Sequence, residues 1–338
     1  MRHHGPIRKF VLYFMGDVSI IGDGPNSRKF DFDQWFLFIT QNGVEEMSIA
    51  FRTAYEINKY FRLPNCIFSC LTLKRLDLCK VLVEPIINAP CIFPNVTSLS
   101  FDGVVFGTIN LDCVIDVPKL QTLSFRLCRN ASYFNIKAPR LGSLTLKNYV
   151  IYEDIEVYSC FTPDNMDLSF IHTLCLDFIF KHFVSEFTRW GPELNVECLE
   201  LAYVVFHDDD DFSSFIHSLR ICPKLRKLDI MTVWIDAEIS EHTLLEGFKS
   251  AAKMLKMLHT LKLGSSKMLK MLHTLKLGSF IGSRSELRFI MMLLACFPAL
   301  EKVVIIRSEM FDPNNEFKIM QKLLNFPRAS RKAKIIYI

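Results

Sequence analysis

The feature that most constrains this chain is a short pattern of apolar residues that recurs along nearly its whole length. Residues 118–125 (PKLQTLSF) and 139–146 (PRLGSLTL) share a proline, followed two residues later by a frame with apolar side chains at its first, fourth and sixth places. Side chains of an extended strand alternate between two faces, so the fourth and sixth places share one face and the third, fifth and seventh share the other. The frame therefore predicts a strand that is buried on one face.

The frame recurs often enough to define a repeat. From the second copy to the ninth, successive frames begin 21 to 30 residues apart, mostly within the roughly 20 to 29 residues typical of leucine-rich repeats. A proline lies two residues before five of the frames, where it ends the preceding connection. We therefore predict an α/β fold, a leucine-rich-repeat solenoid with a curved parallel sheet and irregular helices on its convex side. The frames begin at Ile7, Val44, Leu73, Val96, Leu120, Leu141, Ile171, Val196, Leu225 and Leu300.

Helices are expected between and after the strands. Residues 32–39 place apolar side chains at helical spacing, and Asn42-Gly43 would end that helix. The first strand is expected near residues 7–14. The other predicted elements are helices over 178–190, 212–219, 285–296 and 315–325 and strands over 300–307 and 334–338.

Composition narrows the classes of partner. The net charge of +4 is small and scattered, whereas a nucleic-acid-binding domain gathers its basic residues on one face. The longest apolar run, 289–297, is about half a membrane span. Eleven cysteines without a secretory segment indicate reduced thiols, and hence a cytoplasmic or nuclear protein. We expect neither nucleic acid nor a membrane as a partner.

The sequence lacks the motifs typical of catalysis and of cofactor or metal binding. It contains no GxxxxGK[ST] phosphate loop, no GxGxxG, no GxSxG and no HExxH. Cys66 and Cys70 lie in a hydrophobic connection, which favours buried structural cysteines over metal ligands. The aspartates at 208–211 precede a helical pattern, which favours helix capping over cation binding. We predict no catalytic, cofactor-binding or metal-binding residues, and we do not expect an enzyme.

Several segments resemble the plant F-box/FBD/LRR-repeat proteins. They are 5–12 (GPIRKFVL), 33–38 (DQWFLF), 42–46 (NGVEE), 63–68 (LPNCIF), 93–100 (FPNVTSLS), 137–141 (KAPRL), 286–290 (ELRFI), 298–301 (PALE) and 326–330 (FPRAS). The resemblance implies a leucine-rich-repeat solenoid over residues 1–271 and an FBD-like C-terminal module over residues 272–338. In that family an N-terminal F-box docks onto the Skp adaptor of a cullin ubiquitin ligase, and the repeats receive the substrate.

No segment of this sequence resembles an F-box, so a Skp-type adaptor is expected as a partner only if an F-box is encoded upstream. We therefore predict a non-catalytic interaction scaffold that binds a protein on its concave sheet face. The alternative is the substrate-recognition subunit of an SCF-type ubiquitin ligase whose F-box is missing from this sequence.

The odd places of the frames define the expected binding face. They carry small hydroxyl residues, such as Ser98, Ser100, Thr122 and Ser124, among charged residues of both signs. A sheet face that is merely solvated would look the same, and both interpretations stay open. The charged residues predicted to contact a partner are Arg75, Asp77, Asp102, Arg126, Lys147, Asp177, Glu200, Lys227 and Asp229.

One segment is duplicated: residues 253–265 (KMLKMLHTLKLGS) recur without change at 267–279. The offset of 14 residues is too short for two neighbouring parallel strands, which need a crossover of about a dozen residues or more. The first copy continues a helical stripe, whereas the second precedes the FBD-like helix. We predict that the first copy is mostly helical and that the second forms a strand over 273–277, because tertiary context overrides local propensity.

Overall fold

The chain divides into two compact units, residues 1–170 and residues 171–338, in a computed structural model. The predicted boundary at 271/272 lies inside the second unit and stays a prediction. The expected helices over 178–190 and in the first duplicated copy lie outside the described residues, as does most of 212–219. The structure describes residues 5–15, 32–52, 60–84, 92–107, 114–131, 135–147, 168–177, 193–204, 215, 219, 221–232, 271–309 and 316–338.

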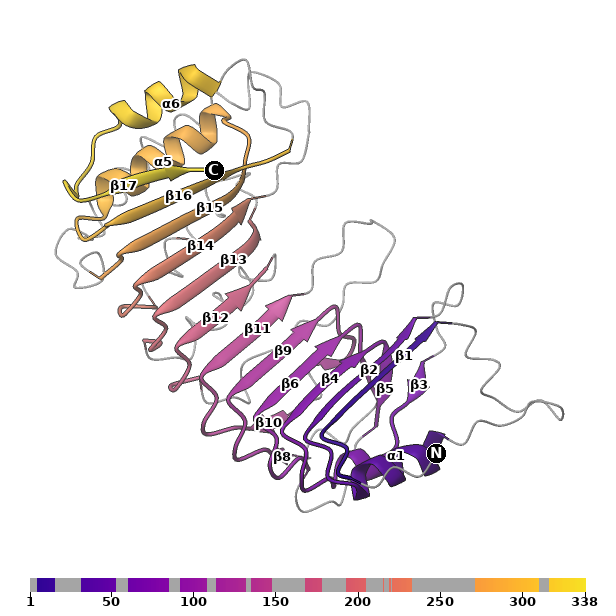
Figure 1. Cartoon of the computed structure of the whole chain (residues 1–338). Coiled ribbons are helices and arrows are strands. Elements are labelled where there is room, and N and C mark those ends of the chain that lie inside the picture. The colour runs from indigo at the N-terminus through magenta and orange to yellow at the C-terminus, as the bar shows by residue number, and fades with distance from the viewer. Residues whose placement is uncertain are drawn as a thin grey trace. The chain divides into compact units, whose positions relative to one another are not determined.

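The first unit is built on a parallel sheet whose strands lie in the order β1-β2-β4-β6-β9-β11 (Figure 1). From β4 onward each strand begins at the third place of its frame, because the first apolar place is still in the turn that enters the strand. The predicted first strand is confirmed. The strands are β1 (Lys9–Met15), β2 (Glu46–Arg52), β4 (Arg75–Cys79), β6 (Ser98–Asp102), β9 (Thr122–Arg126) and β11 (Ser143–Lys147).

Equivalent places of neighbouring frames pair with each other. Leu99 of β6 is paired in register with Leu76 on one side and with Leu123 on the other, and Leu123 is paired with Leu144. All four side chains are fully buried. The predicted leucine-rich-repeat frame, and with it the α/β fold class, is confirmed.

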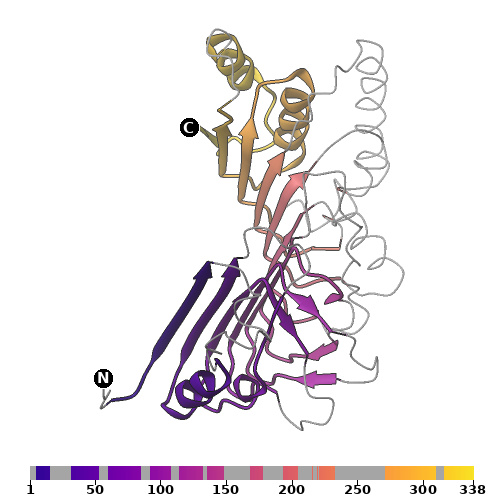
Figure 2. The same ribbon diagram turned by 90° about the vertical axis from the view of Figure 1, so that its right-hand side faces the viewer.

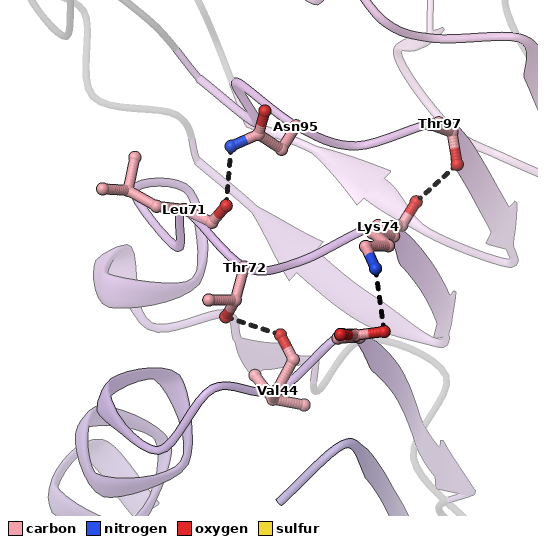
Figure 3. Close-up of polar contacts among 7 residues, drawn as sticks. Val44, Leu71, Thr72, Lys74, Asn95 and Thr97 are labelled. Carbon is pink, nitrogen blue, oxygen red and sulfur yellow. Dashed lines mark hydrogen bonds and ion pairs between the residues drawn. The ribbon is translucent and has the colours of Figure 1, made fainter. Parts of the chain in front are cut away.

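A backbone ladder aligns the repeats where the strands begin. In most frames the carbonyl oxygen at the second place accepts hydrogen bonds from two N–H groups of the next repeat; the oxygen of Lys74, for example, accepts from Thr97 at 2.8 Å and from Ser98 at 3.1 Å. Side chains reinforce this ladder: Thr72 Oγ1 donates to the Val44 carbonyl at 2.7 Å, and Asn95 Nδ2 donates to a carbonyl of the preceding turn (Figure 3). Each repeat is therefore held in place by its neighbour.

Three strands of the first unit, β4, β6 and β9, end in a backbone turn of left-handed conformation. Lys80, Gly103 and Leu127 occupy the same place after their strands, with φ of 54°, 62° and 51°. Their N–H groups donate to the carbonyl oxygens of the next repeat at 2.8, 2.7 and 2.7 Å. The turn sends the chain into shorter strands, which form a second layer beside the main sheet (Figure 2). These are β3 (Phe61–Arg62), β5 (Val81–Val83) and β7 (Val105–Phe106), and separately β8 (Val114–Asp116) and β10 (Asn135–Lys137).

Phenylalanine rings fill the start of the first unit. Helix α1 (Phe32–Gln41), which confirms the predicted helix, buries Phe32, Phe36 and Ile39. The Phe51 and Phe61 rings stack with centroids 4.2 Å apart, and Phe32 meets Phe61 edge-on at 5.3 Å. A short turn of 3-10 helix, η2 (Asn65–Ile67), contacts α1. These phenylalanines therefore form an aromatic core at the start of the first unit, as expected for buried strands.

The second unit continues the same repeat with longer helices. Its parallel strands lie in the order β12-β13-β14-β15-β16-β17. The second duplicated copy forms β15, so that prediction is confirmed, although the strand runs on to Phe280. The predicted helices and strands near the C-terminus are also confirmed. The elements are β12 (Thr173–Leu176), β13 (Cys198–Val204), β14 (Lys227–Thr232), β15 (Thr274–Phe280), α5 (Arg284–Cys296), β16 (Lys302–Arg307), α6 (Glu316–Asn325) and β17 (Lys334–Tyr337).

Helix α5 begins with a capping box that its sequence supplies. The Ser283 hydroxyl accepts from the N–H of Glu286 at 3.2 Å, while the Glu286 carboxylate accepts from the N–H groups of Ser283 at 2.7 Å and Ile281 at 3.1 Å. The helix then buries Ile290 and Leu293. The polar start and the apolar face together attach α5 to the sheet.

Candidate protein-binding face

The unit 1 polar face is the face of the first sheet opposite its buried leucines. It is formed by the third, fifth and seventh places of four adjacent strands, and none of these side chains is buried. Strand pairing arranges them in three rows. The rows are Arg75, Ser98, Thr122 and Ser143; Asp77, Ser100, Ser124 and Thr145; and Cys79, Asp102, Arg126 and Lys147.

Small hydroxyl side chains form the middle of this face. The first two rows carry only serine and threonine on β6, β9 and β11, so the surface there is low and rich in donors and acceptors. The third row places Asp102, Arg126 and Lys147 side by side. With neighbouring strands about 4.8 Å apart, the four strands span about 14 Å, which suits a protein segment laid across them.

Asp77 is a partly desolvated charge of the unit 1 polar face. Burial raises the pKa of its carboxyl group, and the Glu46 carboxylate raises it further. The nearby cations of Arg75 and Lys9 oppose this shift, Arg75 more strongly. Glu46 and Lys9 were not predicted as face residues, although both occupy the third place of their frames and lie in register on β2 and β1. A partly desolvated carboxylate is well placed to receive a basic group of a partner.

The unit 2 polar face is the face of the second sheet that carries Glu200, Lys227, Asp229 and Lys276, and its centre is charged. Glu200, Asp229 and Lys276 occupy the same place on β13, β14 and β15. Lys276 Nζ donates to Asp229 Oδ2 at 2.7 Å, and the Asp229 side chain is only 16% exposed. Lys227, one row away, is exposed. The structure therefore brings the predicted residues Glu200, Lys227 and Asp229 onto one face and adds Lys276, which the sequence analysis did not name.

Comparison with known proteins bears on the same repeats. Residues 32–162 match the family described as "FBD-associated F-box protein At5g56370, LRR repeats". The "F-box/FBD/LRR-repeat protein At1g13570" of Arabidopsis thaliana is 26% identical over 382 aligned positions, which cover 99% of this chain and 81% of that protein. The chain is therefore similar to plant F-box/FBD/LRR-repeat proteins over nearly its whole length. The predicted resemblance is therefore confirmed, and it extends from the first described strand to the last.

Asp177 departs from the expectation for this repeat family. It was predicted to be exposed on the binding face, but its side chain is 0% exposed. The reason is that β12 is covered on both sides: Cys175, at the fifth place, is also buried, together with Leu174 and Leu176. Asp177 is therefore removed from the exposed face, whereas the other eight predicted residues keep accessible side chains.

Cys128 and Cys222 are buried thiols. Burial raises the pKa of Cys128 and of Cys222 to about 12, so both stay protonated and unreactive at neutral pH. Among the residues that the structure describes, there is no group of three or more His, Cys, Asp or Glu side chains placed to hold a metal ion. None of the helices in the described part of the chain is long and apolar enough to cross a membrane.

Proposed function

We propose that this chain is a non-catalytic interaction scaffold that binds a protein partner on the polar faces of its leucine-rich-repeat sheets. The observation that carries the proposal is the in-register unit 1 polar face, with a floor of hydroxyl side chains and charged residues at its margins. Such a face offers many weak polar contacts over a broad area, which is typical of protein recognition by repeat proteins.

Charge distribution on this face suggests how the partner is oriented. Asp77 lies on β4, while Arg126 and Lys147 lie on β9 and β11. A partner with a basic group over β4 and an acidic group over β9 and β11 would be attracted in one orientation and repelled in the reverse one. We expect these charges to determine specificity and association rate more than total affinity.

A charge reversal on the face tests the proposal. Arg126→Glu changes an exposed arginine of the face, and Arg140→Glu is the matched control, an exposed arginine in the turn before β11. Proteins captured by the tagged chain from plant extract would be quantified by mass spectrometry for the wild type and both variants. A partner lost with Arg126→Glu and retained with Arg140→Glu supports the proposal. Recovery of the same set from all three contradicts it.

A second role is favoured by the name of the Arabidopsis relative, which includes an F-box; this chain spans 81% of that protein. We propose as an alternative that the chain is the substrate-recognition part of an SCF-type ubiquitin ligase, in the cytoplasm or nucleus. The test is to sequence the transcript upstream of Met1 and to coprecipitate the encoded protein with a Skp-type adaptor. An upstream reading frame without an F-box, together with no adaptor recovered, contradicts this alternative.

A further inference from the structure

The last two strands of the second sheet carry their own pattern on the unit 2 polar face. On β16 the third place is a lysine and the fifth and seventh places are apolar, and β17 repeats this pattern in register. The strands of the first unit from β6 to β11 carry only hydroxyl and charged side chains at these places. We call the six residues the basic-apolar patch; they lie on the strands labelled β16 and β17 in Figure 1. They are Lys302, Val304 and Ile306 on β16 and Lys334, Ile336 and Ile338 on β17.

The two lysines of the patch lie directly opposite each other. Lys302 and Lys334 are paired in register on neighbouring strands, and both are exposed. Lys227 adds a third exposed cation to this row, with Thr274 between it and Lys302. The row contains no acidic residue on any strand from β12 to β17. Like charges directly opposite each other destabilise a sheet, so an anionic group placed over this row would relieve their repulsion.

Two acidic side chains beside the row of lysines have other partners. Asp229, one row away, accepts from Lys276 Nζ at 2.7 Å, and its side chain is 16% exposed. Glu301, which precedes β16, has its Oε1 atom 3.7 Å from Nδ1 of His273. The row of lysines therefore keeps a positive charge that a partner can use.

The apolar members of the patch lie farther along the same two strands. Val304 is 9% exposed, Ile336 is 37% exposed and Ile338 is 63% exposed. Ile306 is half-buried. Alternate residues of a strand are about 6.7 Å apart, so each lysine is about 13 Å from the second apolar residue of its own strand. An extended segment with an acidic end over the lysines would therefore place its following residues over the apolar places.

We propose that the basic-apolar patch binds an extended segment of a protein partner in which carboxylates are followed by apolar side chains. The carboxylates would pair with Lys302 and Lys334 and relieve the repulsion between them. The apolar side chains would cover Ile336 and Ile338, and every second residue of the segment would face the sheet. The inference rests on the proposed function, because it names the chemistry of a partner for the unit 2 polar face.

Two other occupants fit the patch less well. An anionic membrane also binds lysines beside apolar side chains, but a flat surface over this face would bring its headgroups against the carboxylates of Glu200 and Asp229. Val304 is only 9% exposed, so contact with it requires a side chain that enters between its neighbours. A second copy of this patch would bring lysines against lysines, which opposes association.

The test uses the full chain and a labelled synthetic peptide with glutamates at one end and alternating valines and threonines at the other. Its binding is measured by fluorescence anisotropy. We expect Lys302→Glu combined with Lys334→Glu to weaken binding by at least about tenfold, because attraction becomes repulsion. The matched control is Lys318→Glu combined with Lys322→Glu, which changes two exposed lysines of α6 outside the patch. It should stay within about twofold of the wild type.

The apolar part of the patch is tested by a second pair of variants. Ile336→Ser combined with Ile338→Ser should weaken binding by about fivefold, because two apolar side chains no longer gain burial. Phe317→Ser combined with Leu324→Ser is the control, since it removes two exposed apolar side chains of α6, and it should leave binding unchanged. Circular dichroism establishes that each variant is folded, which is expected because all the changed residues are exposed.

Absence of peptide binding, equal binding by the Lys302→Glu and Lys334→Glu variant, or equal binding of a peptide with lysines in place of glutamates would overturn the proposal. Binding to phosphatidylserine vesicles that this variant abolishes would also overturn it, by identifying a membrane as the occupant. Arg126→Glu lies on the first sheet and should bind the peptide as the wild type does. A partner from plant extract that is lost with Arg126→Glu, together with no peptide binding, would remove this inference and leave the proposed function standing.

Discussion

Replacing Leu123 with alanine tests the packing that holds the repeats together. Leu123 lies in β9, is 0% exposed and is paired in register with Leu99 and Leu144. Truncation removes buried apolar surface and leaves a cavity between strands whose backbone hydrogen bonds prevent them from closing it. We expect the free energy of unfolding to fall by about 2–5 kcal/mol, with the upper half of that range favoured because both neighbours are equally buried.

Ser124→Ala is the control. Ser124 follows Leu123 in the same strand, and its side chain is only half-buried and lies on the polar face. Its cost should stay within about 0.5 kcal/mol. Both variants would be unfolded in urea and followed by far-ultraviolet circular dichroism, and the change in midpoint would be read at constant slope. If the two variants lost comparable stability, the alternation of buried and open faces inferred for β9 would be incorrect.

Three further predictions concern individual contacts. Gly103→Ala should lower the unfolding free energy by about 1–2 kcal/mol in thermal melts, because Gly103 has φ of 62° and an added Cβ would lie 3.2 Å from Lys80 Cγ; an unchanged melting temperature would contradict this. Burial raises the pKa of Glu286 above 4.5, so the folded state holds that proton more tightly and stability declines as the pH rises above 4.5. Urea titrations should show that Glu286→Gln becomes more stable relative to the wild type as the pH rises above 4.5. A difference in unfolding free energy that does not change with pH would refute this cause. For the ion pair of Asp229 and Lys276, a double-mutant cycle should give a coupling of about 1 kcal/mol that decreases with salt, and zero coupling would show that the pair is only a surface contact.

The strand frame was predictable because it depends only on residues that are close together in the sequence. In the segment TLSFR of β9, alternation alone states that Leu123 and Phe125 share one face and that Ser124 lies on the other. Each repeat pairs with its neighbours through the same ladder, so knowing the frame at Leu99 and Leu123 also gave the register between them. The repeat architecture follows from nearest-neighbour contacts, which a sequence pattern contains.

The candidate site was less predictable, because charges meet across strands that are far apart in the chain. Lys276 was not named as a face residue, since its frame begins at Leu272, 47 residues after the frame at Leu225 and outside the regular spacing. Only the pairing of β14 with β15 places it beside Asp229. No pattern within either strand indicates this contact.

The sequence by itself determined the repeat, the direction of its side chains and the resemblance to a known family. Those properties depend on neighbouring residues and on the short distance between one repeat and the next. Tertiary structure decided which odd places stay open: Asp177 and Ser124 occupy odd places of their frames, yet Asp177 is buried and Ser124 is accessible. Burial depends on what covers a strand, and a pattern within the strand does not specify this.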